Sequence, residues 1–307
     1  SLTNGSTYYY RISANDNAGN ESSKTSDVTS MPHVTDGDYS LSFDGTDDLV
    51  SITSTSVFTS IGSGDFSILL WSKFDSDDTW EGLISKGYYE SGVNNAIVIR
   101  REEDGNKIRL SASDGTSNTD IITGSSAITS DNGWTQVVVT RNSNTFTLYI
   151  NGVSDGTGTY SESLWDNNQP VELGQGNGTS NDERFDGNLD EVAIWDEALT
   201  AAEIAALFNS GNPLAATSNS GNYTSAANVK GYWRFGENTG TKAHDLSGSG
   251  NHGTISGATY VSPGADAAGP TISSVSSTTA DGTYNIGDTL AITAIFNEIV
   301  TVTGTPQ

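Results

Sequence analysis

Four aromatic residues stand in polar, loop-like stretches, where they could do recognition chemistry. They are Trp80 in Asp-Asp-Thr-Trp-Glu, Tyr88 and Tyr89 in Gly-Tyr-Tyr-Glu-Ser-Gly, and Trp165 in Leu-Trp-Asp-Asn-Asn. Sugar rings stack on exposed aromatic faces while carboxylates and amides bond the sugar hydroxyls. We predict these four residues as glycan contacts. The alternative, which the sequence leaves open, is that they cap one end of the fold.

Two stretches of the sequence match catalytic or cofactor-binding motifs but lack the strand–turn–helix context that these motifs require. Gly152-Val-Ser-Asp-Gly156 matches the nucleophile-elbow string, but it follows a hairpin strand and precedes Thr-Gly-Thr-Tyr instead of a helix. The stretch 248–253, Gly-Ser-Gly-Asn-His-Gly, matches the dinucleotide string, again without strand–turn–helix context. His33, His244 and His252, with no cysteine in the chain, offer no zinc-type site. We therefore predict a protein that is not an enzyme.

Composition limits the partners and the fold. The chain has 307 residues, 38 acidic against 13 basic side chains, a net charge of −25 and a pI near 4.1. Affinity for phosphate backbones needs clustered Lys and Arg, so we expect no nucleic-acid binding. Apolar runs are far shorter than the ~18 residues of a membrane span, so we expect no insertion. Aspartate with abundant Gly, Ser, Thr and Asn is typical of loop-rich all-β proteins, and the absence of cysteine favours a bacterial surface or secreted protein without disulfides.

The candidate residues must be positioned by strands and one helix. Val137, Val139, Phe146, Leu148 and Ile150 alternate at period two across a turn at 142–144, which predicts a hairpin with one buried face. Asn151-Gly152 predicts a second turn of type I′. Strand patterns also contain Trp71, Trp134, Trp195 and Trp233, which we expect in the core.

One short helix interrupts the strands. Thr200-Ala-Ala-Glu203 has the spacing of a capping box, and Ile204, Leu207 and Phe208 share one face. Asn209-Ser-Gly211 predicts its end. We expect this helix to cover one end of the folded body.

The chain divides into three predicted pieces. Residues 1–33 contain two strands, residues 34–264 form a long β-rich body, and residues 265–307 give alternating strands again after the small-residue stretch between Pro263 and Pro270. The first piece resembles the last strands of a fibronectin type III module, with Leu2 and Tyr8 at tyrosine-corner spacing. The last piece resembles the opening strands of a bacterial immunoglobulin-like repeat, in Gly287–Glu298. Both resemblances cover partial modules, which either borrow strands from a neighbouring module or chain in a head-to-tail array or belong to a longer polypeptide.

The body resembles the LamG-like jelly roll of the concanavalin A-like lectin and glucanase class. The resemblance rests on segments in a fixed order, which are Leu41–Asp48, Phe66–Trp71, Trp134–Arg141, Leu148–Gly152, Phe185–Trp195 and Gly231–Gly236 followed by Asp245–Gly253. It implies an all-β fold: a jelly-roll sandwich with one short helix, plus partial Ig-like β-sandwich segments at both ends.

The resemblance also implies a calcium site. In this class a calcium ion commonly ties the Phe-Asp-Gly turn to the Asp-Glu-Val strand, and the matching positions are Asp44, a carbonyl of Gly45, Asp48 and Asp190. Calcium takes six to eight hard oxygen ligands, which turn carboxylates and carbonyls supply. The alternative is that Asp44 makes an Asx-turn and Asp190 a hydrogen bond.

Other acids fit known patterns less well. β-Glucanases of this class carry paired acids on one strand, whereas Asp190-Glu191 and Asp196-Glu197 have the wrong spacing. The acidic stretch 75–78 and Asp245 do not follow the calcium-loop repeat, and we predict them as solvated loops.

The sequence predicts a calcium-stabilised, non-catalytic module of a large bacterial surface or secreted protein. Its function would be adhesion or carbohydrate binding, with glycans or cell-surface polysaccharide as partners. Two alternatives stay open: an accessory binding module of a polysaccharide-degrading enzyme, and a structural spacer or filament repeat without a ligand.

Overall fold

The computed structural model describes residues 8–10, 28–30, 39–53, 64–87, 96–165, 169–176, 183–265, 272–277 and 292–296. The chain forms two compact units, residues 1–266 and 267–307. Tyr88 and Tyr89 lie outside the described residues. In the described part of the chain, no helix is long and apolar enough to span a membrane.

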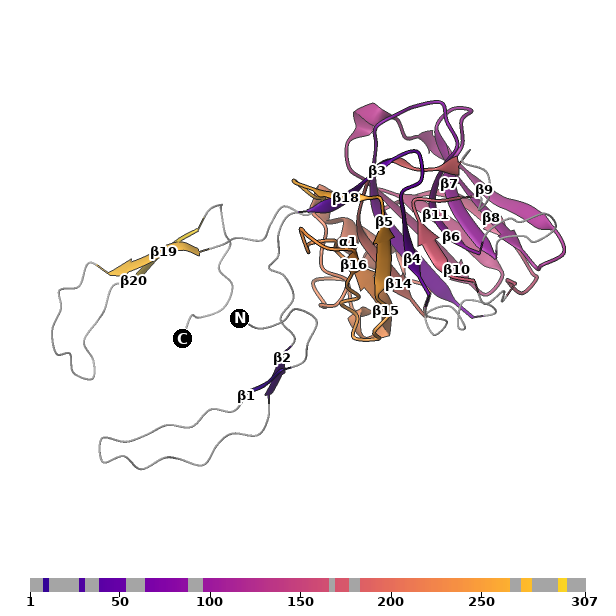
Figure 1. The fold of residues 1–307 in the computed structure, drawn as a ribbon. Coiled ribbons are helices and arrows are strands. Elements are labelled where there is room, and N and C mark those ends of the chain that lie inside the picture. The colour runs from indigo at the N-terminus through magenta and orange to yellow at the C-terminus, as the bar shows by residue number, and fades with distance from the viewer. Residues whose placement is uncertain are drawn as a thin grey trace. The chain divides into compact units, whose positions relative to one another are not determined.

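The first unit contains a body of two antiparallel sheets. Its elements are β3 Ser40–Asp44, β4 Leu49–Ile52, β5 Phe66–Phe74, β6 Glu81–Lys86, β7 Ile97–Arg101, β8 Lys107–Ser113, β9 Asn118–Ala127, β10 Thr135–Asn142, β11 Thr145–Ile150, β12 Val153–Thr159, β13 Val171–Leu173, β14 Asp186–Trp195, α1 Ala201–Phe208, β15 Val229–Trp233, β16 Lys242–Ala243, β17 Gly253–Ser256 and β18 Thr259–Val261. One sheet has the order β12-β11-β10-β5-β14-β3-β18, with β15 paired to the second half of β14, and the other has the order β16-β17-β4-β13-β6-β7-β8-β9 (Figure 1).

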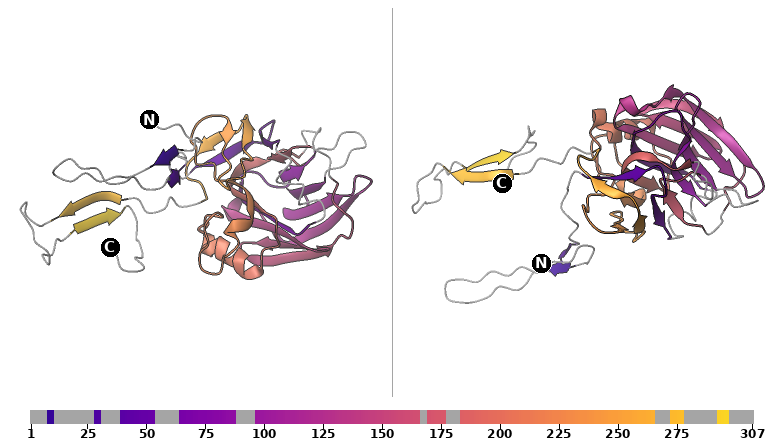
Figure 2. Two further views of the ribbon diagram at one scale, coloured as in Figure 1. Left: turned by 90° about the horizontal axis from the view of Figure 1, so that it is seen from below. Right: turned by 45° about the horizontal axis from the view of Figure 1, so that its top comes forward.

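The strands lie in layers, as Figures 1 and 2 show, and the two sheets bury one apolar core. The predicted hairpin is confirmed: β10 pairs with β11, and the alternating residues Val137, Val139, Phe146 and Leu148 are buried. Asn151 and Gly152 both have positive φ, at 49° and 78°, as a type I′ turn requires. The all-β sandwich expected from the sequence is therefore present.

A second apolar cluster lies on the outer face of the first sheet. Trp71, Trp195 and Tyr232 meet Ile204 and Leu207 of α1 there. The capping box of α1 is confirmed, because Thr200 Oγ1 accepts from Glu203 N at 3.3 Å and Glu203 Oε2 accepts from Thr200 N at 3.0 Å. The expectation that α1 covers an end of the body is wrong: the helix packs on a sheet face, since β5 and β14 are apolar on both sides and need a second cover.

Three of the four strand tryptophans, Trp71, Trp195 and Trp233, are at most 1% exposed, so their core placement is confirmed. Trp134 is partly buried against the outer cluster. The remaining strands among the described residues form two separate two-stranded sheets. In the first unit β1 Tyr8–Tyr10 pairs with β2 Val28–Ser30, and in the second unit β19 Ile272–Ser277 pairs with β20 Ile292–Phe296. Their assignment to fibronectin type III and immunoglobulin-like modules stays a prediction.

Candidate functional site

The connection between β3 and β4 gathers three carboxylates. Asp44 Oδ1 accepts from the amide of Thr46 at 2.9 Å, and the left-handed φ of 72° at Gly45 turns the chain sharply. Asp48 folds back, so that its Oδ2 accepts from the amide of Asp44 at 3.0 Å. Carboxylate oxygens of Asp44, Asp47 and Asp48 lie within 4.8 Å of one another. Among the described residues, no other group of three acidic, histidine or cysteine side chains gathers in this way.

The electrostatics of this turn favour a bound cation. Burial raises the pKa of Asp48, and the negative charges of Asp44 and Asp47 raise it further, against the amide of Asp44 and the charge of Arg184. A cation among the carboxylates would offset both the burial of Asp48 and the repulsion from its neighbours. Hard carboxylate oxygens are the donors that calcium prefers, so the residues present fit the predicted metal.

The structure does not bring Asp190 to this turn. β14 pairs with β3 in a register that sets Asp186, not Asp190, opposite Asp44. Asp190 lies four residues farther along β14, where its Oδ1 accepts from Glu191 N at 2.8 Å and its Oδ2 accepts from Ala265 N at 2.7 Å. The predicted grouping is thus corrected: Asp44, Gly45 and Asp48 lie in one turn, Asp190 lies apart from it, and the β14 residue opposite Asp44 is Asp186.

A pocket of about 300 Å³ opens beside the turn. It is lined by residues from three segments, which are Asp44, Gly45, Ser76, Thr79, Trp80, Glu81, Arg184 and Asp186. The pocket therefore joins the predicted metal turn to Trp80, one of the predicted glycan contacts. Sequence reasoning missed Glu81, Arg184 and Asp186. One signal for Asp186 was available, because Phe185-Asp-Gly repeats Phe43-Asp-Gly and the two phenylalanine rings meet at 5.7 Å.

Two arginines hold the indole ring of Trp80. The guanidinium carbons of Arg100 and Arg109 lie 4.7 and 5.2 Å from its centre. These arginines are cross-strand partners on β7 and β8, and acids fix them in turn: Arg100 Nη1 bonds Glu183 at 2.6 Å and Arg109 Nη1 bonds Asp120 at 3.0 Å. Cation–π contacts of this kind orient the ring, so Trp80 reaches the pocket in a fixed pose.

Glu81 is a buried acid in the wall of the same pocket. Its Oε1 accepts from Ser76 Oγ at 3.1 Å and from Asp186 N at 3.2 Å, and its Oε2 pairs with the buried guanidinium of Arg101. Burial raises the pKa of Glu81 to about 7, against the pull of Arg101. Glu81 therefore ties β6 to the first residue of β14 and holds that edge of the pocket closed.

Arg184 supplies a positive group to the pocket wall. Its Nε and Nη1 atoms are buried and have no hydrogen-bond partner within the described residues. Buried guanidinium N–H groups without acceptors are costly, so this arginine is suited to bonding the hydroxyl or carboxylate of a ligand.

Trp165 belongs to a different place. Its amide donates to the carbonyl of Ser113 at 2.9 Å, and its ring packs on Gly115, where a Cβ would come within 2.9 Å of the indole. Ser113 ends β8, whereas Arg109, which contacts Trp80, lies near the start of that strand, and Arg100 is its cross-strand partner on β7. Trp80 and Trp165 thus do not share one binding platform.

The acids considered for catalysis make structural bonds. Glu191 bonds Arg234 Nε at 2.6 Å and the hydroxyl of Tyr232, and Asp196 pairs with Lys230 at 2.9 Å. The string 152–156 forms a turn and the start of β12, not a strand–turn–helix. Asp245, predicted in a solvated loop, is 5% exposed and accepts three backbone amides, so that expectation is wrong.

The antiparallel two-sheet body with its outer helix defines the class of jelly-roll sandwiches. The family model of the concanavalin A-like lectin/glucanases superfamily matches residues 44–205, more than half of the chain, and the chain belongs to this family. No curated protein matches it.

Solved structures with related folds come from several sources. A protein from Bacteroides ovatus ATCC 8483, with carbohydrate binding provisionally assigned, is 15% identical with a TM-score of 0.51, over 85% of this chain and 70% of that one. Domain 4 of an extracellular GH43 arabinanase from Geobacillus stearothermophilus, in complex with arabinotriose, is 19% identical with a TM-score of 0.43, over 64% and 80%. The CBM40 of a Ruminococcus gnavus IT-sialidase, bound to α2,3-sialyllactose, is 12% identical with a TM-score of 0.45, over 55% and 96%. The likeness to the Bacteroides protein concerns the fold.

Proposed function

We propose that this chain is a non-catalytic carbohydrate-binding module of a bacterial surface or secreted protein, stabilised by calcium. The observation that carries the proposal is the placement of Trp80 in one pocket with Arg184, Asp186 and Asp44. An aromatic face beside acceptors and a donor is the combination that sugar rings and their hydroxyls need. Membership of a superfamily of lectins and glucanases supports a carbohydrate ligand.

Calcium would be held at the β3–β4 turn by Asp44, Asp47 and Asp48, and Gly45, which belongs to the same turn, would add its carbonyl oxygen. Its role would be structural, because it would neutralise carboxylates that border the pocket. The parent protein would be an adhesin or, as the notable alternative, a polysaccharide-degrading enzyme that carries this module as an accessory.

Binding of an oligosaccharide panel to the full chain, with calcium or with chelator, tests the proposal. We expect at least one glycan to bind, and Trp80→Ala to weaken it about 10-fold or more, since burying aromatic surface contributes about 1.5–3 kcal/mol. Trp165→Ala is the matched control, because that tryptophan lies away from the pocket, and it should leave the affinity unchanged. If no glycan binds under either condition, the chain is a spacer or filament repeat instead.

A further inference from the structure

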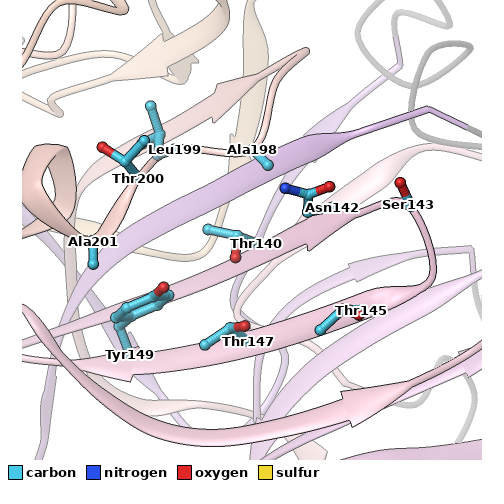
Figure 3. Close-up of a pocket in the computed structure, with 10 residues that line it drawn as sticks. All are labelled: Thr140, Asn142, Ser143, Thr145, Thr147, Tyr149, Ala198, Leu199, Thr200 and Ala201. Atoms are coloured by element: carbon cyan, nitrogen blue, oxygen red, sulfur yellow. The ribbon is translucent and has the colours of Figure 1, made fainter.

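A second and larger cavity lies on the outer face of the first sheet. It has a volume of about 570 Å³ and lies between the β10–β11 hairpin and the segment 198–201 that leads into α1 (Figure 3). It shares no lining residue with the pocket at Trp80. Its volume falls within the range of ligand sites, roughly 300–1,000 Å³.

The strand alternation that builds the core also builds this groove. Because Val139, Phe146 and Leu148 point inward, the residues between them must point outward. Thr140 stands directly opposite Thr147, and Asn142 opposite Thr145, in the β10–β11 register. Directly opposed side chains lie about 5 Å apart, so the hairpin presents two adjacent rows of hydroxyl and amide groups. α1 covers the apolar part of this sheet face, and the hydroxyl-bearing part lies beside it.

The opposite wall of the groove is rigid and its polar groups are engaged. The amide of Leu199 donates to Ser67 Oγ at 2.8 Å, and that hydroxyl donates to the carbonyl of Glu197 at 2.8 Å. Thr200 is bound by Glu203 in the capping box. Ligand recognition therefore falls to the hairpin side chains, against a wall that is fixed before binding.

No charged side chain lines the groove, although the chain carries a net charge of −25. An anionic ligand would be repelled by the net negative charge of the protein, and no lysine or arginine in the groove would compensate for that repulsion. A cationic ligand would have no carboxylate to pair with in the groove. Threonine hydroxyls and the Asn142 amide both donate and accept hydrogen bonds. The phenol of Tyr149 is neutral near pH 7; burial raises its pKa further, against a hydrogen bond with Thr147, and the half-buried ring adds an apolar surface.

We infer that this groove is a second binding site, selective for uncharged saccharides and independent of the calcium turn. Each sugar hydroxyl is a donor and an acceptor, which matches the two rows of hairpin groups, and one sugar face can rest on Tyr149. Uncharged saccharides are the ligands that combine hydroxyls, an apolar ring face and no charge. The inference goes beyond the proposed function, because it needs neither Trp80 nor a metal.

The test is calorimetric titration of the full chain in excess chelator with neutral oligosaccharides (cello-, xylo-, malto- and arabino-hexaose) and acidic ones (oligogalacturonate and sialyllactose). We expect a neutral oligosaccharide to bind and the acidic ones not to. Thr147→Val and Tyr149→Phe each remove one hydroxyl with little change of shape, and each should weaken binding about 3–10-fold. Thr157→Val is the matched control, because Thr157 is the exposed cross-strand partner of Thr147 on β12, outside the groove.

Trp80→Ala separates this site from the first one. If neutral saccharides still bind to Trp80→Ala and the affinity falls with Thr147→Val, the inference holds even where the pocket at Trp80 proves inactive. If neutral saccharides do not bind in chelator, or if their affinity depends on Trp80 and not on Thr147 and Tyr149, the inference is overturned. Equal binding of the acidic oligosaccharides at this groove would also overturn it.

Discussion

Asp48→Asn should have opposite effects on stability with and without calcium. Asp48 is 7% exposed, and its Oδ2 accepts the amide of Asp44. Asparagine keeps the shape and an acceptor oxygen but removes the charge. Without calcium, burial and the charges of Asp44 and Asp47 disfavour the ionised carboxylate, as its raised pKa shows. A neutral amide is relieved of that cost, so in chelator the variant should melt at or above the wild-type temperature.

With calcium the order should reverse. An ion present at 100 times its dissociation constant stabilises the fold by about 2.7 kcal/mol. For a domain of 150–250 residues, 1 kcal/mol shifts the melting temperature by about 2–4 °C. Wild type should therefore gain about 5–11 °C from calcium, and Asp48→Asn should lose most of that gain, because the site loses one of three charged ligands.

Four melting curves measure this effect: wild type and variant, each in calcium and in chelator. Asp114→Asn is the matched control, because Asp114 Oδ1 accepts the amide of Thr116 at 2.7 Å in the same way that Asp44 Oδ1 accepts that of Thr46. That turn belongs to no carboxylate cluster among the described residues, so its variant should respond equally in both conditions. If Asp48→Asn lowers the melting temperature by the same amount with and without calcium, Asp48 is a hydrogen-bond acceptor only, and the calcium site is wrong.

Four further outcomes are expected. Gly82→Ala should lower the free energy of unfolding by about 3 kcal/mol or more, because the new Cβ would fall 1.7 Å from the amide nitrogen of Gly176. Gly240→Ala is the control: it has open space around it and should cost about 1 kcal/mol. Equal melting temperatures of the two variants would contradict the close approach. Glu203→Gln should lower the free energy of unfolding by about 1–3 kcal/mol at pH 7. Burial opposes ionisation of Glu203, but its hydrogen bonds outweigh burial and lower its pKa. The difference in stability between wild type and variant should therefore shrink as the pH falls below about 4.5, and a difference that stays constant would refute this account. In chelator, the melting temperature should fall between pH 5 and pH 8, because burial raises the pKa of Glu81 to about 7 in the folded protein. The folded state therefore holds the Glu81 proton more tightly than the unfolded chain does, and the stability that this gives is lost as the pH rises through 7. Glu81→Gln should flatten that slope, and a melting temperature that rises with pH would count against this account. Saccharide binding in chelator should change little between low and high salt, because uncharged ligands are insensitive to screening, and a steep salt dependence would point to a charged contact.

Local patterns predicted the parts of the fold that depend on neighbouring residues. The alternation around Val139 and Leu148 gave the hairpin, and Thr200 with Glu203 gave the start of α1, because both signals act within a few residues. The place of α1 on a sheet face was not predictable in this way. It depends on the burial of strands such as β5 on both faces. A short apolar run in the sequence fits a central strand and a core helix equally well, so it does not show which faces need a cover.

The site was predictable only where it lies within one turn. Asp44, Gly45 and Asp48 belong to a single connection, so their proximity follows from sequence spacing. The register of β14 against β3 sets Asp186 opposite Asp44 and leaves Asp190 four residues farther along the strand, about 13 Å away at the rise of a strand. That register is fixed by pairing between segments far apart in the sequence, so the motif match alone could not show which aspartate lies beside the turn.

Negative charge is distributed differently around the two cavities described above. At the β3–β4 turn three carboxylates crowd together and raise the pKa of the buried one, which makes a cation the natural partner. At the hairpin groove the same chain presents hydroxyls, an amide and a phenol without any charge. None of the residues that line the groove is acidic, although the chain carries 38 acids in 307 residues. Under the two proposals, the crowded carboxylates of the turn would favour a cation, and the uncharged lining of the groove would favour a neutral sugar.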